Sequence, residues 1–406
     1  MRLLLPCAAL AMCLGLQARA GDLLFYPQGP LFACSAYSVG GTDEGRLPVA
    51  ERQADLARAR RAGLNFIGPQ YELDADAAAD AARHGFAGSI RTIGINRDHQ
   101  KGESLAISAE DLEIQIGTQV HAALNQGPVA FWNIRQEELR YWRADDMLYL
   151  DRLTQAIRRA DAQAHPIMMY EPGHRSADEL VQSDRFVDLV TMGIYVNYGE
   201  MMDNRVWVAL AMQDQMAAAQ RLGGKRGPFL IIEMFADPPA DRIADIPAFV
   251  AHDIFRGLAE GAKGLIVFSF RHRAGFAAYD SYRDSYENLL PLICGNAPLG
   301  QAIISGDRLA LAVTIASGPL ALDIAKYKRA RTAAPVAATL FSHDGQRFLV
   351  LVNSANLPVT GVIEGIAAMP ESARVLVRSA PAAKLEGNSF SLPALAVMVV
   401  EDGSRP

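Results

Sequence analysis

Two glutamates follow short apolar segments in this sequence, and a carboxylate in such a position is a candidate for proton transfer. Glu137 lies near the end of residues 128–139, which read PVAFWNIRQEEL. Glu233 directly follows the apolar run 229–232, which reads FLII. Two carboxyl groups that face each other across a cleft can act on a sugar acetal: one protonates the leaving oxygen, and the other attacks the anomeric carbon or activates water.

The alternation of residue types in 128–139 favours Glu137 over its neighbour Glu138. Successive side chains of a β-strand point to opposite faces, so Asn133, Arg135 and Glu137 share one face. In a barrel of parallel strands, polar side chains near the carboxyl end of a strand face the mouth. We therefore expect Glu137 at the mouth and Glu138 pointing away from it.

The elements that must position these residues alternate between strand and helix. From residue 31 onward, short apolar runs alternate with helical patterns, which is typical of βα units and a parallel sheet. The predicted strands are 31–39, 64–68, 88–95, 128–139, 166–170, 187–196, 229–232 and 264–270. The predicted helices are 49–62, 75–84, 108–125, 145–164, 176–182, 206–222, 246–260 and 282–293. Eight such pairs within about 260 residues indicate a (β/α)8 barrel, in which the fourth and seventh strands lie opposite each other.

The pattern changes after Cys294. Residues 298–313 read as a helix, and short strand-like runs separated by turn residues then follow at 337–342, 347–352, 359–364, 373–378 and 394–400. This spacing is typical of a small antiparallel β-sandwich. The basic run 326–331 reads as a solvated face. The predicted class is thus α/β, with a (β/α)8 TIM barrel over 21–297 and a small all-β sandwich domain over 298–406.

The first twenty residues have the composition of a signal peptide. Arg2 precedes an apolar stretch, and Ala18-Arg19-Ala20 matches a cleavage site, so we expect a chain beginning at Gly21 that is exported to the periplasm or the medium. The alternative is an uncleaved anchor. The apolar stretch is too short for a membrane span. The net charge of −6 and the lack of a basic stripe give no indication of nucleic-acid binding.

Cleavage before Gly21 would leave two cysteines, Cys34 and Cys294. Cys34 lies early in the first strand, near the bottom of the barrel, and Cys294 follows the last helix, which returns to the bottom beside that strand. A disulfide there would hold the closing seam of the barrel in an oxidising compartment. Two buried thiols are the alternative.

The arrangement resembles the (β/α)8 glycoside hydrolases of clan A. The resembling segments are 131–137, FWNIRQE, and 229–235, FLIIEMF. The resemblance implies Glu137 as acid/base on strand four and Glu233 as nucleophile on strand seven, with retention of configuration and no metal or other cofactor. It also implies a C-terminal β-domain. The chain departs from the clan at Gln136, where Asn is usual, and at the end of strand eight, where it has Phe268-Ser269-Phe270 instead of Trp.

Residues near the strand ends are candidates for contacts with the glycan. The predicted substrate-binding residues are Tyr195, Asn197, Gln136, Glu171, Arg271 and Trp132. As in the resembling clan, Tyr195 could hydrogen-bond the nucleophile, although it could equally pack in the interior. Candidate sugar-stacking platforms are Trp142, Trp207, Tyr37 and Tyr71, each of which could instead serve core packing.

Other chemistries find little support in the sequence. It contains no G-x-S-x-G elbow, Walker loop, G-x-G-x-x-G fingerprint or H-E-x-x-H motif. The first predicted strand has no His-x-His metal pair. We therefore expect an exported glycosidase that cleaves O-glycosidic bonds of an oligo- or polysaccharide. The alternative is a barrel protein that binds polysaccharide without cleaving it, for example in envelope polysaccharide handling.

Overall fold

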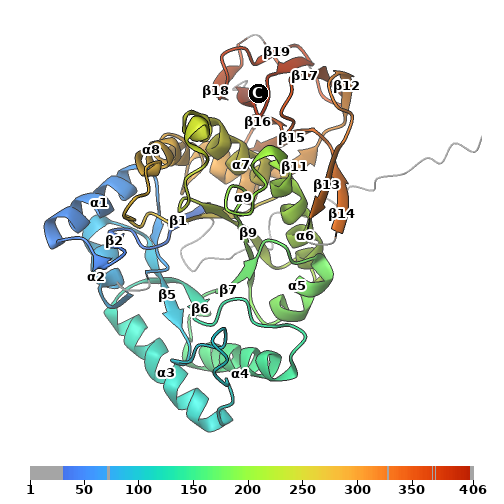
Figure 1. Cartoon of the computed structure of the whole chain (residues 1–406). Coiled ribbons are helices and arrows are strands. Elements are labelled where there is room, and N and C mark those ends of the chain that lie inside the picture. The colour runs from blue at the N-terminus through green and yellow to red at the C-terminus, as the bar shows by residue number, and fades with distance from the viewer. Residues whose placement is uncertain (1–30, 71–73, 327–328, 368, 371, 403–406) are drawn as a thin grey trace, which may run out of the picture.

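The computed structural model describes residues 31–70, 74–326, 329–367, 369–370 and 372–402. The predicted cleavage site and Tyr71 therefore lie outside the described residues. The centre of the molecule is one sheet of eight parallel strands, in the order β1-β10-β9-β8-β7-β6-β5-β4 (Figure 1). The strands are β1 (Ala33–Ala36), β4 (Phe66–Ile67), β5 (Gly88–Ile93), β6 (Val129–Ile134), β7 (Ile167–Pro172), β8 (Leu189–Ile194), β9 (Gly227–Glu233) and β10 (Gly264–Phe268). A small hairpin, β2 (Gly41–Thr42) and β3 (Gly45–Arg46), follows the first barrel strand.

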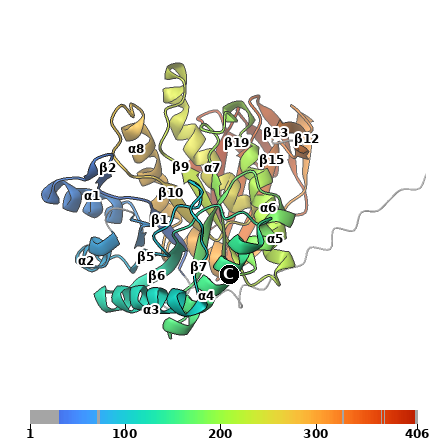
Figure 2. The same ribbon diagram turned by 60° about the horizontal axis from the view of Figure 1, so that its bottom comes forward.

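Helices follow the strands and surround the sheet, as Figures 1 and 2 show. They are α1 (Val49–Arg61), α2 (Asp74–His84), α3 (Ala109–Gln126), α4 (Ala144–Ala160), α5 (Ala177–Asp184), α6 (Trp207–Arg221), α7 (Ile246–Glu260) and α8 (Tyr279–Leu289). Short 3-10 turns lie at η3 (Met202–Asn204), η4 (Ala240–Asp245) and η5 (Leu290–Leu292). Local sequence begins two of these helices. The Ser108 side chain caps α3, and Ser176 forms a reciprocal capping box with Glu179 at α5. The (β/α)8 barrel predicted from the sequence is confirmed.

The barrel closes between β1 and β4, which are its first and second strands along the chain. Backbone hydrogen bonds run from Asn65 N to Cys34 O and from Gly68 N to Ala36 O, each at 3.2 Å. Cys34 and Cys294 form a disulfide with a Cα–Cα distance of 5.5 Å. The predicted bridge is therefore confirmed, and it joins the start of the barrel to the segment after its last helix.

Side chains fill the inside of the barrel. Large apolar residues from alternating strand positions form this cluster, including Phe66, Ile90, Phe131, Met168, Phe229 and Ile231. Phe131 packs against both Phe66 and Phe229, with ring centroids 5.4 and 5.7 Å apart. The barrel is thus a packed core, and the active sites of such barrels lie at the face formed by the carboxyl ends of the strands. Among the described residues, no helix is both long and apolar enough to cross a membrane.

The C-terminal part forms two facing antiparallel sheets, as predicted, preceded by helix α9 (Pro298–Ser305). The five-stranded sheet contains β11 (Asp307–Ala310), β15 (Val336–His343), β16 (Gln346–Asn353), β21 (Val397–Asp402) and β18 (Arg374–Arg378). The four-stranded sheet contains β12 (Val313–Ser317), β17 (Val359–Ile363), β20 (Ser389–Leu392) and β19 (Lys384–Glu386). Figure 1 shows this part, in orange and red, beside α7 and α9.

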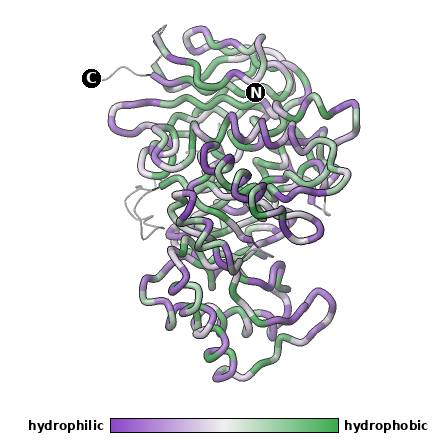
Figure 3. Tube along the Cα trace, turned by 90° about the vertical axis from the view of Figure 1, so that its left-hand side faces the viewer, coloured by the Kyte–Doolittle hydropathy of each residue, from purple (hydrophilic) through white to green (hydrophobic). Residues whose placement is uncertain are grey.

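The five-stranded sheet is buried on both faces. On β16, Val350 and Val352 belong to the apolar cluster that includes residues of α7, whereas Leu349 and Leu351 belong to the cluster between the two sheets. This double burial explains why residues 348–352 read as the continuous apolar run FLVLV instead of alternating. Figure 3 shows hydrophobic stretches of the chain next to hydrophilic ones, with much of the hydrophilic colour in loops at the edge of the molecule.

Two predictions for the region after Cys294 are wrong. Residues 298–313 are helical only as far as Ser305, because Asp307–Ala310 instead forms an edge strand paired with β15. The basic run 326–331 is also not simply a solvated face. It contributes to a hairpin of β13 (Leu322–Lys326) and β14 (Arg329–Ala333). From this hairpin, Arg329 and Arg331 both form ion pairs with Asp214 of α6.

Candidate functional site

A groove runs along the upper rim of the barrel over the carboxyl ends of β5 to β8. It consists of three hollows of about 430, 260 and 430 Å³. The first and second share His99 and Gln100, and the second and third share Glu138 and His174, so the three adjoin. This rim groove is lined by 96–100, Glu103, 135–138, 140–142, Tyr170, 172–175, Glu179, Gly193, Tyr195, 198–200 and Trp207.

Glu137 lies in the first hollow of the rim groove. The polar loop after β5 and the end of β6 form this hollow together, and Glu137 is partly exposed there. Burial raises the pKa of the nearby Tyr170, and the carboxylates of Glu138 and Glu137 act in the same direction. The structure therefore places Glu137 at the mouth, where the alternation of residue types predicts it.

Glu138 does not point away from the mouth, so that prediction is wrong. The strand ends at Ile134, and Glu138 has a positive φ of 55°, which breaks the alternation of side chains. Its backbone N–H donates to Tyr170 O at 3.1 Å, and its side chain lines both the second and third hollows. The rim groove thus contains two adjacent carboxylates, Glu137 and Glu138.

Aromatic side chains line or flank the rim groove. Trp142 lies in the second hollow with 67% of its surface exposed, and Tyr198 lies in the third with 66% exposed. Each packs against one ring, Trp142 against Tyr141 at 4.8 Å and Tyr198 against Phe235 at 5.1 Å. Flat apolar surfaces held open beside polar groups suit the faces of sugar rings.

Glu233, by contrast, is sealed inside the protein. It is 2% exposed and lines none of the three hollows of the rim groove. Its Oε1 accepts a hydrogen bond from Asn197 N at 2.5 Å, and its Oε2 accepts one from Tyr198 N at 3.0 Å. Burial raises the pKa of Glu233 to about 7, against the opposing effects of the nearby Arg205 cation and these two N–H groups. Burial therefore disfavours the ionised form of Glu233, which is the form that the resemblance implies for a nucleophile.

Aromatic packing fills the part of the mouth near Glu233. The rings of Tyr195, Phe235 and Phe268 lie 5.0 to 5.5 Å from one another. Tyr195 also stacks on Tyr170, with ring centroids 6.0 Å apart. Tyr195 therefore has the interior packing role that the sequence left open, although one edge lines the third hollow.

Two predicted substrate contacts are parts of the scaffold. Trp132 is fully buried on the outer side of the sheet and donates from Nε1 to Asp161 at 2.8 Å. Gln136 lines the first hollow, but its amide donates to Ile95 O at 2.7 Å and accepts from the Tyr149 hydroxyl at 2.6 Å. The Gln136 amide thus ties the loop after β5 to α4, which leaves little capacity for a ligand.

Glu171 is also withdrawn from the predicted position. It is a fully buried residue of β7, where it forms an ion pair with Arg175 and accepts a hydrogen bond from Ser183 Oγ at 2.5 Å. Burial raises the pKa of Glu171. The side chain of Asn197 is also occupied by contacts within the protein, since it hydrogen-bonds Tyr282 and Arg205 at 2.5 and 2.7 Å.

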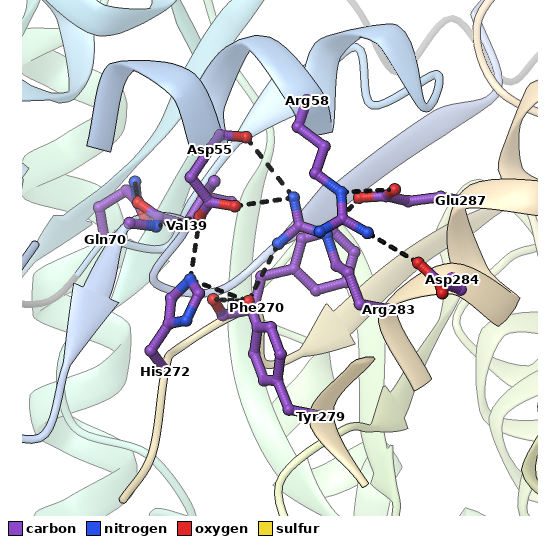
Figure 4. Close-up of polar contacts among 11 residues, drawn as sticks. Val39, Asp55, Arg58, Gln70, Phe270, His272, Tyr279, Arg283, Asp284 and Glu287 are labelled. Carbon is purple, nitrogen blue, oxygen red and sulfur yellow. Dashed lines mark hydrogen bonds and ion pairs between the residues drawn. The ribbon is translucent and has the colours of Figure 1, made fainter. Parts of the chain in front are cut away.

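Arg271 lies on the opposite rim, in the loop after β10. Its Nε donates to Thr42 O at 3.0 Å, so it is tied to the hairpin after β1 and is absent from the lining of the rim groove. Figure 4 shows the polar network that fixes this loop. Arg283, which is fully buried, contacts Asp55 at 3.1 Å, and the Tyr279 hydroxyl contacts His272 at 3.1 Å. With the disulfide, this network holds the first and last βα units together.

Some residues of the rim groove were not among the predicted catalytic or substrate-binding residues, and Glu200 was missed altogether. His99 and His174 come from loops after β5 and β7, and Glu200 and Tyr198 come from the loop after β8. Their only sequence signal is a position shortly after a strand. Among the described residues, no group of three or more His, Cys, Asp and Glu side chains could hold a metal ion.

Comparisons with known proteins identify the fold. No protein-family model matches the sequence, and no curated protein matches it. Among solved structures, Eubacterium rectale Amy13B has a TM-score of 0.56 at 10% identity, covering 95% of this chain and 98% of that one. An alpha-amylase from Geobacillus thermoleovorans, complexed with acarbose, has a TM-score of 0.54 at 10% identity, covering 91% and 98%. Isomaltulose synthase from Klebsiella sp. LX3 has a TM-score of 0.53 at 10% identity, covering 92% and 98%. At this identity, the likeness shows that the chain shares their overall fold.

Proposed function

We propose that this protein is a glycoside hydrolase that binds an oligo- or polysaccharide in the rim groove. The observation that carries the proposal is the groove itself: three adjoining hollows that contain Glu137 and Glu138 and are flanked by the exposed rings of Trp142 and Tyr198. An elongated, polar groove with open aromatic faces suits a chain of sugar rings. The similar structures include an alpha-amylase and an isomaltulose synthase, which supports carbohydrate chemistry on this fold.

In this proposal Glu137 is the acid/base. It is partly exposed at the carboxyl end of β6, beside the groove into which a glycosidic oxygen would be placed. Protonation of the leaving oxygen by a positioned carboxyl typically contributes about 10²- to 10⁴-fold to the rate. Glu233 remains the proposed nucleophile of a retaining mechanism. That role requires the buried carboxylate to become accessible to the anomeric carbon when substrate binds.

The experiment that tests the proposal measures the release of reducing ends from a panel of oligo- and polysaccharides. Glu137→Gln should lower kcat/KM by about 10²- to 10⁴-fold and spare substrates with good leaving groups, which need no proton at departure. Glu110→Gln is the control, because Glu110 is exposed in the first turn of α3, lines none of the three hollows and should leave activity unchanged. For Glu233, the Ala variant should lose hydrolysis, and azide should restore turnover with formation of a glycosyl azide. Full activity in Glu137→Gln or Glu233→Ala would contradict the assignments.

A second candidate function is binding of a polysaccharide without cleavage. The burial of Glu233 favours it, because a retaining glycosidase needs a second carboxylate within reach of the anomeric carbon. Saturable glycan binding with no release of reducing ends by the native protein would select this function. In that case Trp142→Ala should still weaken binding, whereas Glu137→Gln should leave it nearly unchanged.

We also propose that residues 1–20 are removed on export and that 21–297 and 298–406 form two domains. The disulfide supports export to an oxidising compartment, since structural disulfides are rare in the cytosol. Intact mass of the protein secreted by its native host should correspond to a chain starting at Gly21. A mass that includes Met1 would contradict processing.

A further inference from the structure

A buried chain of polar contacts links Glu233 to the C-terminal sheets. It begins at Asn197, whose backbone N–H binds the Glu233 carboxylate at 2.5 Å. The Asn197 side-chain oxygen accepts a hydrogen bond from Arg205 Nη1 at 2.7 Å. Arg205 is 1% exposed, so its guanidinium is fully enclosed between the loop after β8 and α7. Arg205 therefore fixes the position of Asn197, which in turn binds Glu233.

Arg205 is itself held from two directions. Its Nε and Nη2 donate to the two carboxylate oxygens of Asp253 at 3.1 and 2.5 Å, which is a bidentate pair. Its guanidinium also lies over the ring of Phe249, 4.1 Å from the centroid. The planar guanidinium of arginine can contact Asp253, Asn197 and the Phe249 ring at once, which the ammonium group of lysine cannot do.

The chain continues to the β-sandwich. Asp253 Oδ1 contacts His252 Nδ1 at 2.9 Å, and His252 Nε2 contacts Ser354 Oγ at 2.8 Å. His252 is fully buried, and Ser354 directly follows β16. Ser354 also accepts a hydrogen bond from Arg256 at 2.8 Å. A residue of the C-terminal sheets thus completes a network that ends at Glu233.

We propose that Arg205 is a positioning residue for Glu233, buttressed by Asp253, His252 and, from the C-terminal sheets, Ser354. Arg205 places the Asn197 N–H on the carboxylate and holds its own positive charge near it. The catalytic meaning of this positioning depends on the proposed function, whereas the positioning itself does not. The C-terminal sheets would then help to position a residue of the site, through Ser354.

The test follows the ionisation of Glu233 by NMR in protein labelled with ¹³C in the glutamate carboxyl groups. The Glu233 signal is assigned by its absence in Glu233→Gln. Arg205→Lys keeps the positive charge but loses the planar guanidinium that binds Asp253 and Asn197 together. The Asn197 N–H should then be displaced from the Glu233 carboxylate, and the apparent pKa of Glu233 should rise by about one unit. Arg242→Lys is the matched control, because Arg242 lies over the same Phe249 ring but forms ion pairs with Asp203 and Asp245 instead.

An unchanged Glu233 titration in folded Arg205→Lys, or an equal shift in Arg242→Lys, would overturn the proposal. Should Arg205→Lys fail to fold, Asn197→Ala provides the second measurement, since it removes the Arg205 contact from a partly exposed residue. It should shift the Glu233 titration in the same direction, and no shift would count against positioning. If the native protein hydrolyses glycans, Arg205→Lys should also lower kcat by about tenfold with KM little changed. Absence of hydrolysis in the native protein would contradict the proposed function but leave the NMR result decisive for Arg205.

Discussion

Removal of the disulfide should destabilise this protein mainly through its unfolded state. Cys34 and Cys294 join residues 260 positions apart, so the bridge closes most of the barrel into one loop. In the folded protein, the seam keeps other contacts without the bridge: Gly295 N donates to Phe32 O at 2.9 Å, and Phe32 N donates to Gly295 O at 3.2 Å. Replacement of both cysteines by alanine should therefore leave the native structure intact.

The size of the effect follows from the length of the loop. For 260 residues, the loss of loop-closure entropy corresponds to about 5–6 kcal/mol at 25 °C, whereas measured bridges usually contribute about 2–4 kcal/mol. We expect Cys34→Ala/Cys294→Ala to lower the free energy of unfolding by about 2–5 kcal/mol. The denaturant m-value should rise, because the variant's unfolded chain exposes more surface than a cross-linked chain.

Urea unfolding followed by circular dichroism measures both quantities. Native protein treated with a reductant should unfold like the double variant, which controls for the loss of the sulfur atoms. Thiol titration of the denatured, unreduced chain that begins at Gly21 should detect no free thiol. Two reactive thiols in that chain, or a change in unfolding free energy below about 0.5 kcal/mol in the double variant, would refute this reasoning.

Three further predictions concern the site and the contact between α6 and the β13–β14 hairpin. Because burial raises the pKa of Glu233 to about 7, its contribution to stability is fully present below about pH 4.5 and is lost as the pH rises to 7. Over this range the free energy of unfolding of the native protein should therefore fall by an extra amount on the order of 3 kcal/mol, and Glu233→Gln should abolish this extra fall. Asp214→Asn should weaken the contact with Arg329 and Arg331 and increase hydrogen exchange in β13 and β14, whereas unchanged exchange would show that the pairs contribute little. Trp142→Ala should raise the Kd for a bound glycan about tenfold by titration calorimetry, and the remote, 61% exposed Leu357, changed to Ala, should have no such effect.

The barrel and the sandwich could be predicted from sequence because their signals are local. The apolar runs, their period and the turn residues between them depend only on neighbouring positions, and α7 begins and ends where the pattern indicates, at Ile246 and Glu260. The Cys34–Cys294 bridge followed from topology, since a closed barrel must bring its first strand beside its last helix. The prediction failed where pairing with a distant strand overrides the local pattern: Asp307–Ala310 continues a helical pattern but forms a strand paired with β15.

The chemical surroundings of the candidate residues were decided only by the tertiary structure. The sequence by itself placed Glu137 and Glu233 at the ends of the fourth and seventh strands; in the structure Glu233 ends β9, whereas Glu137 lies three residues beyond the end of β6 at Ile134. It could not show that Glu233 is buried, because Asn197 and Tyr198, which donate to its carboxylate, and Arg205, which contacts Asn197, come from another βα unit. The groove beside Glu137 likewise depends on the loops after four neighbouring strands, β5 to β8. Strand position is encoded by neighbours along the chain, whereas exposure and pKa are set by groups that only folding brings together.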